Sequence, residues 1–86
     1  MKLIPYIDNG TEYLDVTVNK DHKAGILRFS HEILVTFVKK DGKYVFNSAW
    51  HCGVSEMSWG QGEEDSFEET FPGLLDEMKK AITMMR

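Results

Sequence analysis

The sequence is poor in cysteine and proline and contains no long hydrophobic run. Its 86 residues include one cysteine, Cys52, and two prolines. A single cysteine excludes an internal disulfide and a cysteine-rich zinc module, and it favours a reducing compartment. Pro5 and Asp8 interrupt the N-terminal apolar stretch before the h-region of a signal peptide would be complete. No stretch approaches the roughly 20 apolar residues of a transmembrane helix, so we expect a cytoplasmic protein with no membrane contact.

Positive charge is also absent from a long segment. Residues 44–78 contain no lysine or arginine. The same segment holds eight acidic side chains: Glu56, Glu63, Glu64, Asp65, Glu68, Glu69, Asp76 and Glu77. The formal net charge of -4 is therefore unevenly distributed, because this segment carries negative charge only. Such a segment repels phosphates and attracts basic surfaces.

The length and composition indicate one globular domain over residues 1–86. The chain is 42% hydrophobic and 28% charged, which is ordinary for a folded domain and unlike a disordered one. A chain of this size buries about 60% of the surface that it exposes when unfolded, so one core is expected and two are not.

Strands are predicted in the first half of the chain. Apolar residues alternate over residues 12–19, a turn follows over 19–25, and residues 26–29 and 33–38 are rich in β-branched and aromatic side chains. The alternative is a helix with one face made of Leu27, His31, Leu34 and Val38. We favour strands because residues 33–38 are apolar on both alternating faces, as in a central strand.

A hairpin is the clearest local signal. Asp41 and Gly42 lie between two apolar runs and tolerate the positive φ angles of a type I′ turn. The strand that follows, over residues 44–52, should place Tyr44, Phe46, Ser48, Trp50 and Cys52 on one face. The other face should carry Val45, Asn47, Ala49 and His51. A weaker strand over residues 3–7 belongs at an edge, because Pro5 lacks an N–H group.

In the C-terminal third, the sequence predicts a connection followed by a helix. Glycines interrupt residues 53–62, whereas Ser66 and Glu69 match a capping box. One helical face is then apolar, with Phe67, Phe71, Leu74, Leu75, Met78, Ile82 and Met85. Pro72 and Gly73 should kink this segment or split it in two. The expected fold is α+β, an antiparallel sheet of about four strands with a C-terminal amphipathic helix packed on one face.

Catalytic chemistry has little support in the sequence. His51 and Cys52 are adjacent on a strand, so they should point to opposite faces and fail to activate each other. We expect a buried thiol beside a surface imidazole. His22 and His31 lie at no recognised zinc-ligand spacing, and the acidic residues 63–65 lack the pattern of a calcium loop. No enzyme activity, metal or cofactor is therefore predicted.

Direct nucleic-acid binding is not predicted either. Trp50 and Trp59, with Tyr44 and Phe46, would be suited to stacking on bases, but the segment has no positive charge to follow the phosphates. At least one tryptophan is expected in the core. Lys39, Lys40 and Lys43 at the hairpin tip are expected to be solubilising.

The function that these features favour is binding to a basic protein surface. We expect a small acidic domain that blocks a nucleic-acid-binding host protein by offering carboxylates where phosphates would lie. The predicted contacts are Trp59, Glu63, Glu64, Asp65, Glu68 and Glu69. In kind, the chain is similar to accessory inhibitors of phages and mobile elements, including anti-CRISPR proteins, with no residue role carried over. The alternatives are a homo-oligomeric structural protein, a homodimer included, and a small enzyme using Cys52 or His51.

Overall fold

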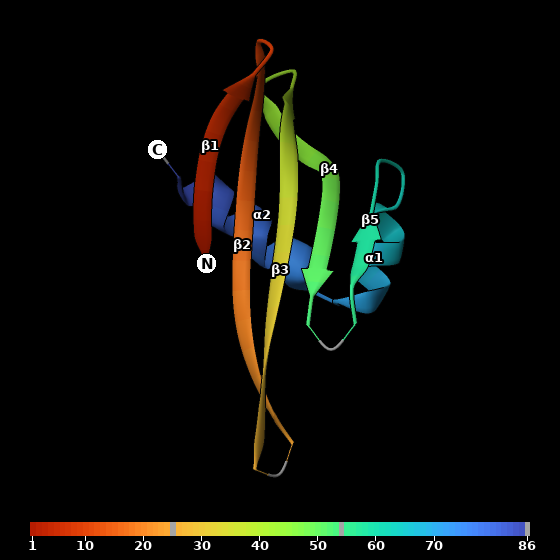
Figure 1. The fold of residues 1–86 in the computed structure, drawn as a ribbon. Helices are drawn as coiled ribbons and strands as arrows, with labels where there is room; N and C mark the ends of the chain where they lie inside the picture. Colours follow the sequence, from red (N-terminus) through yellow and green to blue (C-terminus); the bar gives the residue numbers. More distant parts are fainter. Residues whose placement is uncertain (25, 54, 86) are drawn as a thin grey trace.

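The computed structural model describes residues 1–24, 26–53 and 55–85, with side chains described outside 20–24 and 27–29. Five strands form one antiparallel sheet in chain order (Figure 1): β1 Lys2–Asp8, β2 Thr11–Ala24, β3 Leu27–Lys40, β4 Lys43–Cys52 and β5 Met57–Trp59. Two helices follow, α1 Glu64–Thr70 and α2 Leu74–Met84. The predicted α+β class is confirmed, with five strands in place of about four.

Tight turns connect β1 to β2 and β3 to β4. Asp41 and Gly42 have φ angles of 53° and 80° between β3 and β4, as a type I′ turn requires. Asn9 and Gly10 have φ angles of 49° and 77° between β1 and β2. This second turn has the same chemistry as the first and was not among the sequence predictions. β1 lies at the sheet edge, as Pro5 predicted.

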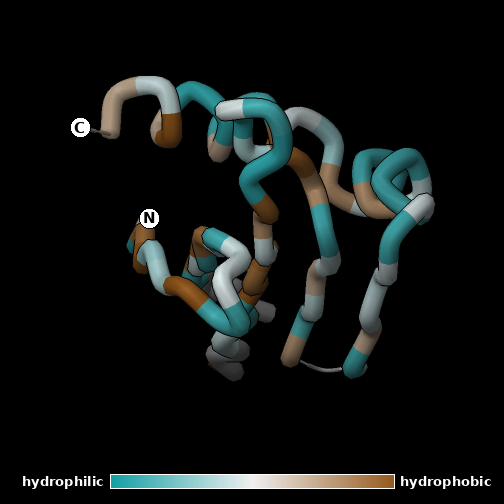
Figure 2. Tube along the Cα trace, turned by 90° about the horizontal axis from the view of Figure 1, so that it is seen from above, coloured by the Kyte–Doolittle hydropathy of each residue, from teal (hydrophilic) through white to brown (hydrophobic). Residues whose placement is uncertain are grey.

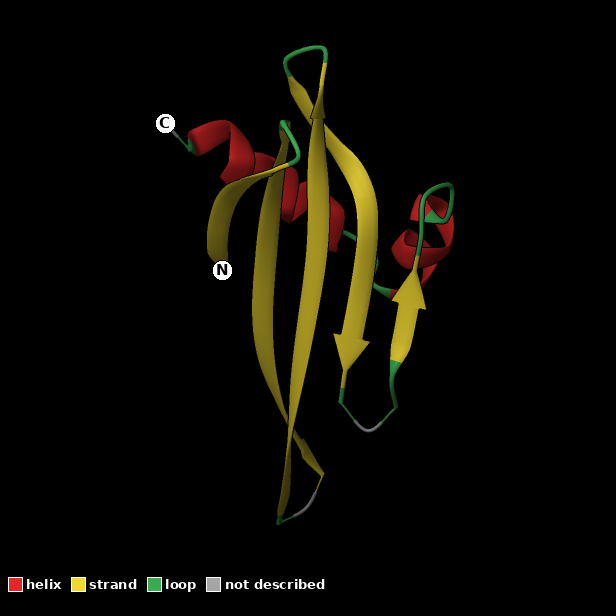
Figure 3. Cartoon of the chain, turned by 45° about the horizontal axis from the view of Figure 1, so that its top comes forward, coloured by secondary structure: helices red, strands yellow, loops and turns green. Residues whose placement is uncertain are grey.

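β2 and β3 are longer than the sequence pattern predicted. Residues 19–24 continue β2 where a turn was expected, and the strands predicted at 26–29 and 33–38 belong to one strand, β3. The two strands pair as far as Ala24 and Leu27. They extend beyond the rest of the sheet as a two-stranded arm (Figure 3). The prediction was wrong here because apolar alternation reports a buried face, and this arm extends past the core, where the two strands continue to pair through their backbones.

Both helices lie on one face of the sheet, as predicted (Figure 2). α1 contacts β4 and β5, and α2 crosses behind the longer strands (Figure 1). The buried side chains of the sheet and the helices form a core cluster that comprises Leu14, Val16, Ile33, Val35, Phe37, Ala49, Trp59, Phe67, Leu74, Leu75 and Met78. The core is therefore the layer between sheet and helices.

The predicted apolar face of the helical segment is confirmed. Its seven residues are all buried in the core cluster or packed against it. The segment is split rather than kinked, because Pro72 and Gly73 lie between α1 and α2 and Gly73 adopts a φ of 80°. Among the described residues, neither helix has the length and apolar character needed to cross a membrane.

The predicted capping box is not formed. Helix α1 begins at Glu64, with Glu63 as its N-cap residue and no side-chain cap bond. Ser66 is therefore inside the helix, where its carbonyl oxygen accepts a hydrogen bond of 3.1 Å from the Thr70 hydroxyl. The helix starts earlier than expected because Glu64 and Asp65 are compatible with a first helical turn, where acidic residues interact favourably with the helix dipole.

A β-bulge at Asn47 reverses the predicted faces in the second half of β4. The pairing passes from Phe37 with Phe46 to Thr36 with Ser48, which leaves Asn47 as an extra residue. One extra residue moves every later side chain to the opposite face. Tyr44 and Phe46 pack against the core on one side of the bulge, and beyond it the buried positions are Ala49 and His51.

The connection predicted over residues 53–62 contains a short strand. β5 has three residues and pairs with β4, with Trp59 opposite Ala49. Three residues are too few to show a period of two, so the pattern could not reveal this strand. Its last residue, Trp59, is the one that enters the core.

Candidate functional site

Four exposed acidic residues lie on α1 and on the first turn of α2. Asp65 and Glu69 are exposed and lie one helical turn apart on α1, so their side chains share a face. Asp76 and Glu77 are exposed in the first turn of α2. None of these four carboxylates forms an ion pair within the described part of the chain. We call these four residues the acidic surface.

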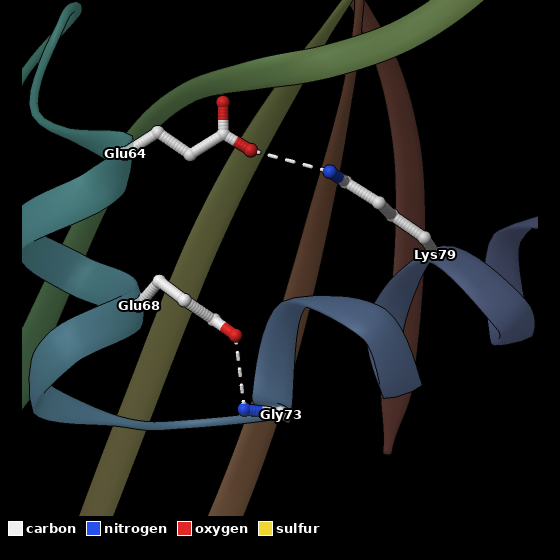
Figure 4. A network of polar contacts seen from close by, with 4 residues as sticks. All are labelled: Glu64, Glu68, Gly73 and Lys79. Atoms are coloured by element: carbon white, nitrogen blue, oxygen red, sulfur yellow. Dashed lines mark hydrogen bonds and ion pairs between the residues drawn. The ribbon is translucent and has the colours of Figure 1, made fainter.

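Glu64 links the two helices. Its Oε2 atom lies 3.2 Å from the Nζ atom of Lys79 on α2 (Figure 4), with both side chains partly exposed. The ion pair neutralises the charge of Lys79, which is the first lysine after residues 44–78. Exposed pairs of this kind contribute less than about 1 kcal/mol, so the contact positions the helices more than it stabilises the fold.

Glu68 contacts the connection between α1 and α2. Its Oε1 atom accepts a hydrogen bond of 3.1 Å from the backbone N–H of Gly73 (Figure 4). The other oxygen, Oε2, is buried and accepts no hydrogen bond from the described residues. Glu68 is thus turned toward the interhelical connection, and it is less available to a partner than its neighbour Glu69.

Glu63 closes the turn between β5 and α1. Its Oε1 atom accepts a hydrogen bond of 2.8 Å from the backbone N–H of Gly60. The backbone N–H of Glu63 in turn donates to the carbonyl oxygen of Gly60 over 3.2 Å. The side chain is exposed, so it adds negative charge beside the acidic surface while ordering the start of α1.

Trp59 is in the core and not on the predicted binding surface. Its side chain is 5% exposed, and its ring meets Phe67 edge to face with 5.1 Å between centroids. Aromatic edge-to-face contacts of this type stabilise a core beyond the area that they bury. The second tryptophan, Trp50, is half-buried, and its indole N–H donates to Glu56 over 2.9 Å.

The six predicted contact residues therefore fall into three groups. Trp59 is core, the carboxylates of Glu63, Glu64 and Glu68 have structural contacts, and Asp65 and Glu69 are exposed without an ion pair in the described structure. The prediction left out Asp76 and Glu77. Pro72 is the sequence feature that could have identified them, because it separates the two helices. The second helix then has acidic residues in its first turn, where they interact favourably with the helix dipole.

Cys52 and His51 are arranged opposite to the prediction. Cys52 is exposed, whereas His51 is 7% exposed and faces the core. The Nε2 atom of His51 lies 3.0 Å from the Nδ1 atom of His31. The bulge at Asn47 explains the reversal, and the two residues still point to opposite faces, so the structure does not form a thiol–imidazole pair. Within the described chain, no three His, Cys, Asp or Glu side chains gather as metal ligands.

Comparison of the chain with protein-family models, with curated proteins and with solved structures finds no match in any of the three. Function is therefore inferred from the geometry of this chain alone.

Proposed function

We propose that the protein is a small cytoplasmic protein-binding domain that inhibits a nucleic-acid-binding partner through its acidic surface. The observation that supports this proposal is the set of four exposed carboxylates, on Asp65, Glu69, Asp76 and Glu77, without ion pairs among the described residues. Surfaces that bind DNA or RNA carry lysine and arginine where phosphates lie. Carboxylates presented on a rigid scaffold occupy the same positions.

The electrostatics favour encounter with a basic partner. Residues 44–78 contain no lysine or arginine, and Lys79, which follows them, is paired with Glu64. A field of one sign accelerates association with an opposite charge, and salt screens it beyond about 8 Å at physiological ionic strength. Binding should therefore be fast and sensitive to salt.

The acidic surface is also held in place before it binds. Phe67 is fully buried and attaches α1 to the core, while Glu68 accepts a hydrogen bond from the backbone N–H of Gly73, the N-cap residue of α2. A preorganised surface loses less conformational entropy on binding than a mobile acidic tail would. The biological setting that we propose is an accessory inhibitor of a phage or mobile element, of the anti-CRISPR kind.

The test begins with capture of partners from a cell lysate at low salt and their elution at high salt. The eluted protein is then purified, and its affinity is measured for this chain and for a nucleic-acid duplex. The proposal requires that the two compete for one site on the partner. Simultaneous binding of both would contradict it.

Charge reversal at two exposed positions localises the contact. D65K/E69K should weaken binding at least tenfold, since interfacial charge pairs contribute on the order of 1.5 kcal/mol or more. These residues form no ion pair in the described structure, so the fold should be retained. D8K/E32K is the matched control, because it changes the net charge equally at two exposed residues of the sheet. Equal weakening by both double variants would mean that net charge acts without a defined site.

The second candidate function is a homo-oligomer, which the uncovered face of the sheet favours. Tyr6 and Tyr13 stack there with 5.4 Å between ring centroids, and Val45 on the same face is 38% exposed. Tyrosines and apolar residues are typical of protein interfaces. Light scattering at increasing protein concentration separates this candidate from a monomeric inhibitor, and V45K should abolish any dimer that uses this face.

A further inference from the structure

An open cleft lies between the β3–β4 hairpin and the C-terminal half of α2. Its volume is about 620 Å³, within the range of sites for small molecules. Three lysines from three elements line it: Lys39 from β3, Lys43 from β4 and Lys79 from α2. The hairpin lysines were expected to be solubilising only, and the fold adds a cation from a distant helix to them.

The charge of this cleft is opposite to that of the acidic surface. Lys43 forms no ion pair with any described residue, so its ammonium group is free to meet a ligand. Lys39 lies 3.7 Å from Glu12 and Lys79 lies 3.2 Å from Glu64, both as exposed pairs. Exposed pairs are weak and exchange readily for a better-placed anion.

The floor of the cleft is apolar and includes an aromatic ring. Tyr44, Ile82 and Met85 line it, and each of them packs partly against the core. The Nζ atom of Lys39 lies 5.7 Å from the centroid of the Tyr44 ring. A flat apolar group placed on this floor would therefore lie next to a positive charge.

The apolar surface continues on the other side of Tyr44. A second hollow of about 370 Å³ is lined by Tyr44, by Pro5, Tyr6 and Ile7 of β1, and by Glu12 of β2. Ile7 is 70% exposed, so its side chain is accessible to a ligand in this hollow. Tyr44 thus belongs to both hollows, with lysines on one side and mainly apolar and aromatic residues of β1 on the other.

We propose that this cleft binds a small organic anion, with its acidic group among Lys39, Lys43 and Lys79 and a flat apolar body against Tyr44. Phosphates, sulfonates and carboxylates share the acceptor chemistry that lysine recognises. A long polyanion fits less well, since Glu12 and Glu64 flank the lysines and the neighbouring helix α1 carries only acidic charges. This site is separate from the acidic surface and does not depend on the proposed function.

The first experiment uses 8-anilinonaphthalene-1-sulfonate, which combines a sulfonate with a flat apolar body. Fluorescence titration should show saturable binding that weakens as salt is added. N-phenyl-1-naphthylamine, which has the same rings without the sulfonate, and inorganic sulfate, which has no rings, should each bind at least tenfold more weakly. Equal binding of either control, or no saturable binding of the first probe, would overturn the proposal.

Two neighbouring lysines provide the matched variants. K43Q should weaken binding of the sulfonate probe about threefold to tenfold, because it removes a lining charge that has no structural partner. K40Q makes the same charge change in the same hairpin, at a residue that does not line the cleft, and should leave affinity unchanged. Equal effects of the two substitutions would overturn the proposal. Circular dichroism of both variants checks that the fold is retained.

Nuclear magnetic resonance locates the bound probe. Amide shifts should concentrate at Lys43 and Tyr44 of β4 and at Thr83 of α2, which line the cleft from two elements. Shifts confined to the uncovered face of the sheet, around Tyr13 and Trp50, would place the probe elsewhere and contradict the assignment.

Discussion

The imidazole rings of His31 and His51 are stacked, and the Nδ1 atom of His31 lies 3.0 Å from the Nε2 atom of His51. The other nitrogen of His51, Nδ1, is buried without a hydrogen-bond partner in the described structure. A proton on that nitrogen would be a buried unpaired donor, which is costly. His51 is therefore expected to carry its proton on Nε2 and to donate it to His31.

The first prediction concerns this hydrogen bond. H31A should lower the free energy of unfolding by about 1–3 kcal/mol, because it leaves the buried N–H of His51 without an acceptor. In an H51F background the same substitution should cost less, since a phenyl ring has no donor and can pack against Phe71 as His51 does. Urea unfolding of the four proteins gives the coupling energy. A coupling near zero would show that the bond adds no stability.

The second prediction concerns Gly53, which follows β4. A Cβ atom at this position would lie 2.5 Å from the Nδ1 atom of His31, which cannot withdraw without losing its bond to His51. G53A should therefore destabilise the fold by about 1–3 kcal/mol. G60A is the control, because the nearest atom there, Oε1 of Glu63, is 3.4 Å away. Thermal unfolding compares the two variants, and equal stabilities would refute the close approach.

The third prediction concerns the pH dependence of Tyr6. Its pKa is raised above 10.0, chiefly because partial burial desolvates the phenolate, and also because Asp15 is charged and accepts its hydrogen bond over 3.3 Å. The protonated phenol therefore contributes stability that is present below pH 10 and lost as the pH rises through the folded pKa.

Titration of the Tyr6 ring by nuclear magnetic resonance checks this cause. D15N should lower the pKa of Tyr6 toward its ordinary value without reaching it, since desolvation remains. D8N should lower it less, because Asp8 is the weakest of the contributing charges. A larger effect of D8N than of D15N would contradict this ranking.

The fourth prediction separates the two tryptophans. W59A should lower the free energy of unfolding by about 3–5 kcal/mol, because it removes a buried ring from the core. W50A should cost about 1 kcal/mol, since this side chain is half-buried and bonded to the exposed Glu56. Urea unfolding followed by circular dichroism measures both. Full stability of W59A would contradict the burial of Trp59 in the core.

The sequence by itself determined the elements whose signal is local. The apolar face of residues 67–85 identified seven side chains that lie in the core cluster or pack against it, because a period of 3.6 is visible within one segment. Asp41 and Gly42 specified their turn through the φ angles that they tolerate, and Pro5 identified an edge strand. The one-signed charge of residues 44–78 was likewise evident from the sequence.

Only the tertiary structure decided which side chains face the core and which distant residues meet. The bulge at Asn47 depends on how β4 registers against β3, and this pairing alone put His51 in the core and Cys52 at the surface. Trp59 is buried because three residues of β5 pair with β4, too few for a pattern. Lys79 joins the hairpin lysines through the path of α2. Each of these depends on contacts between segments distant in the chain, which no local period encodes.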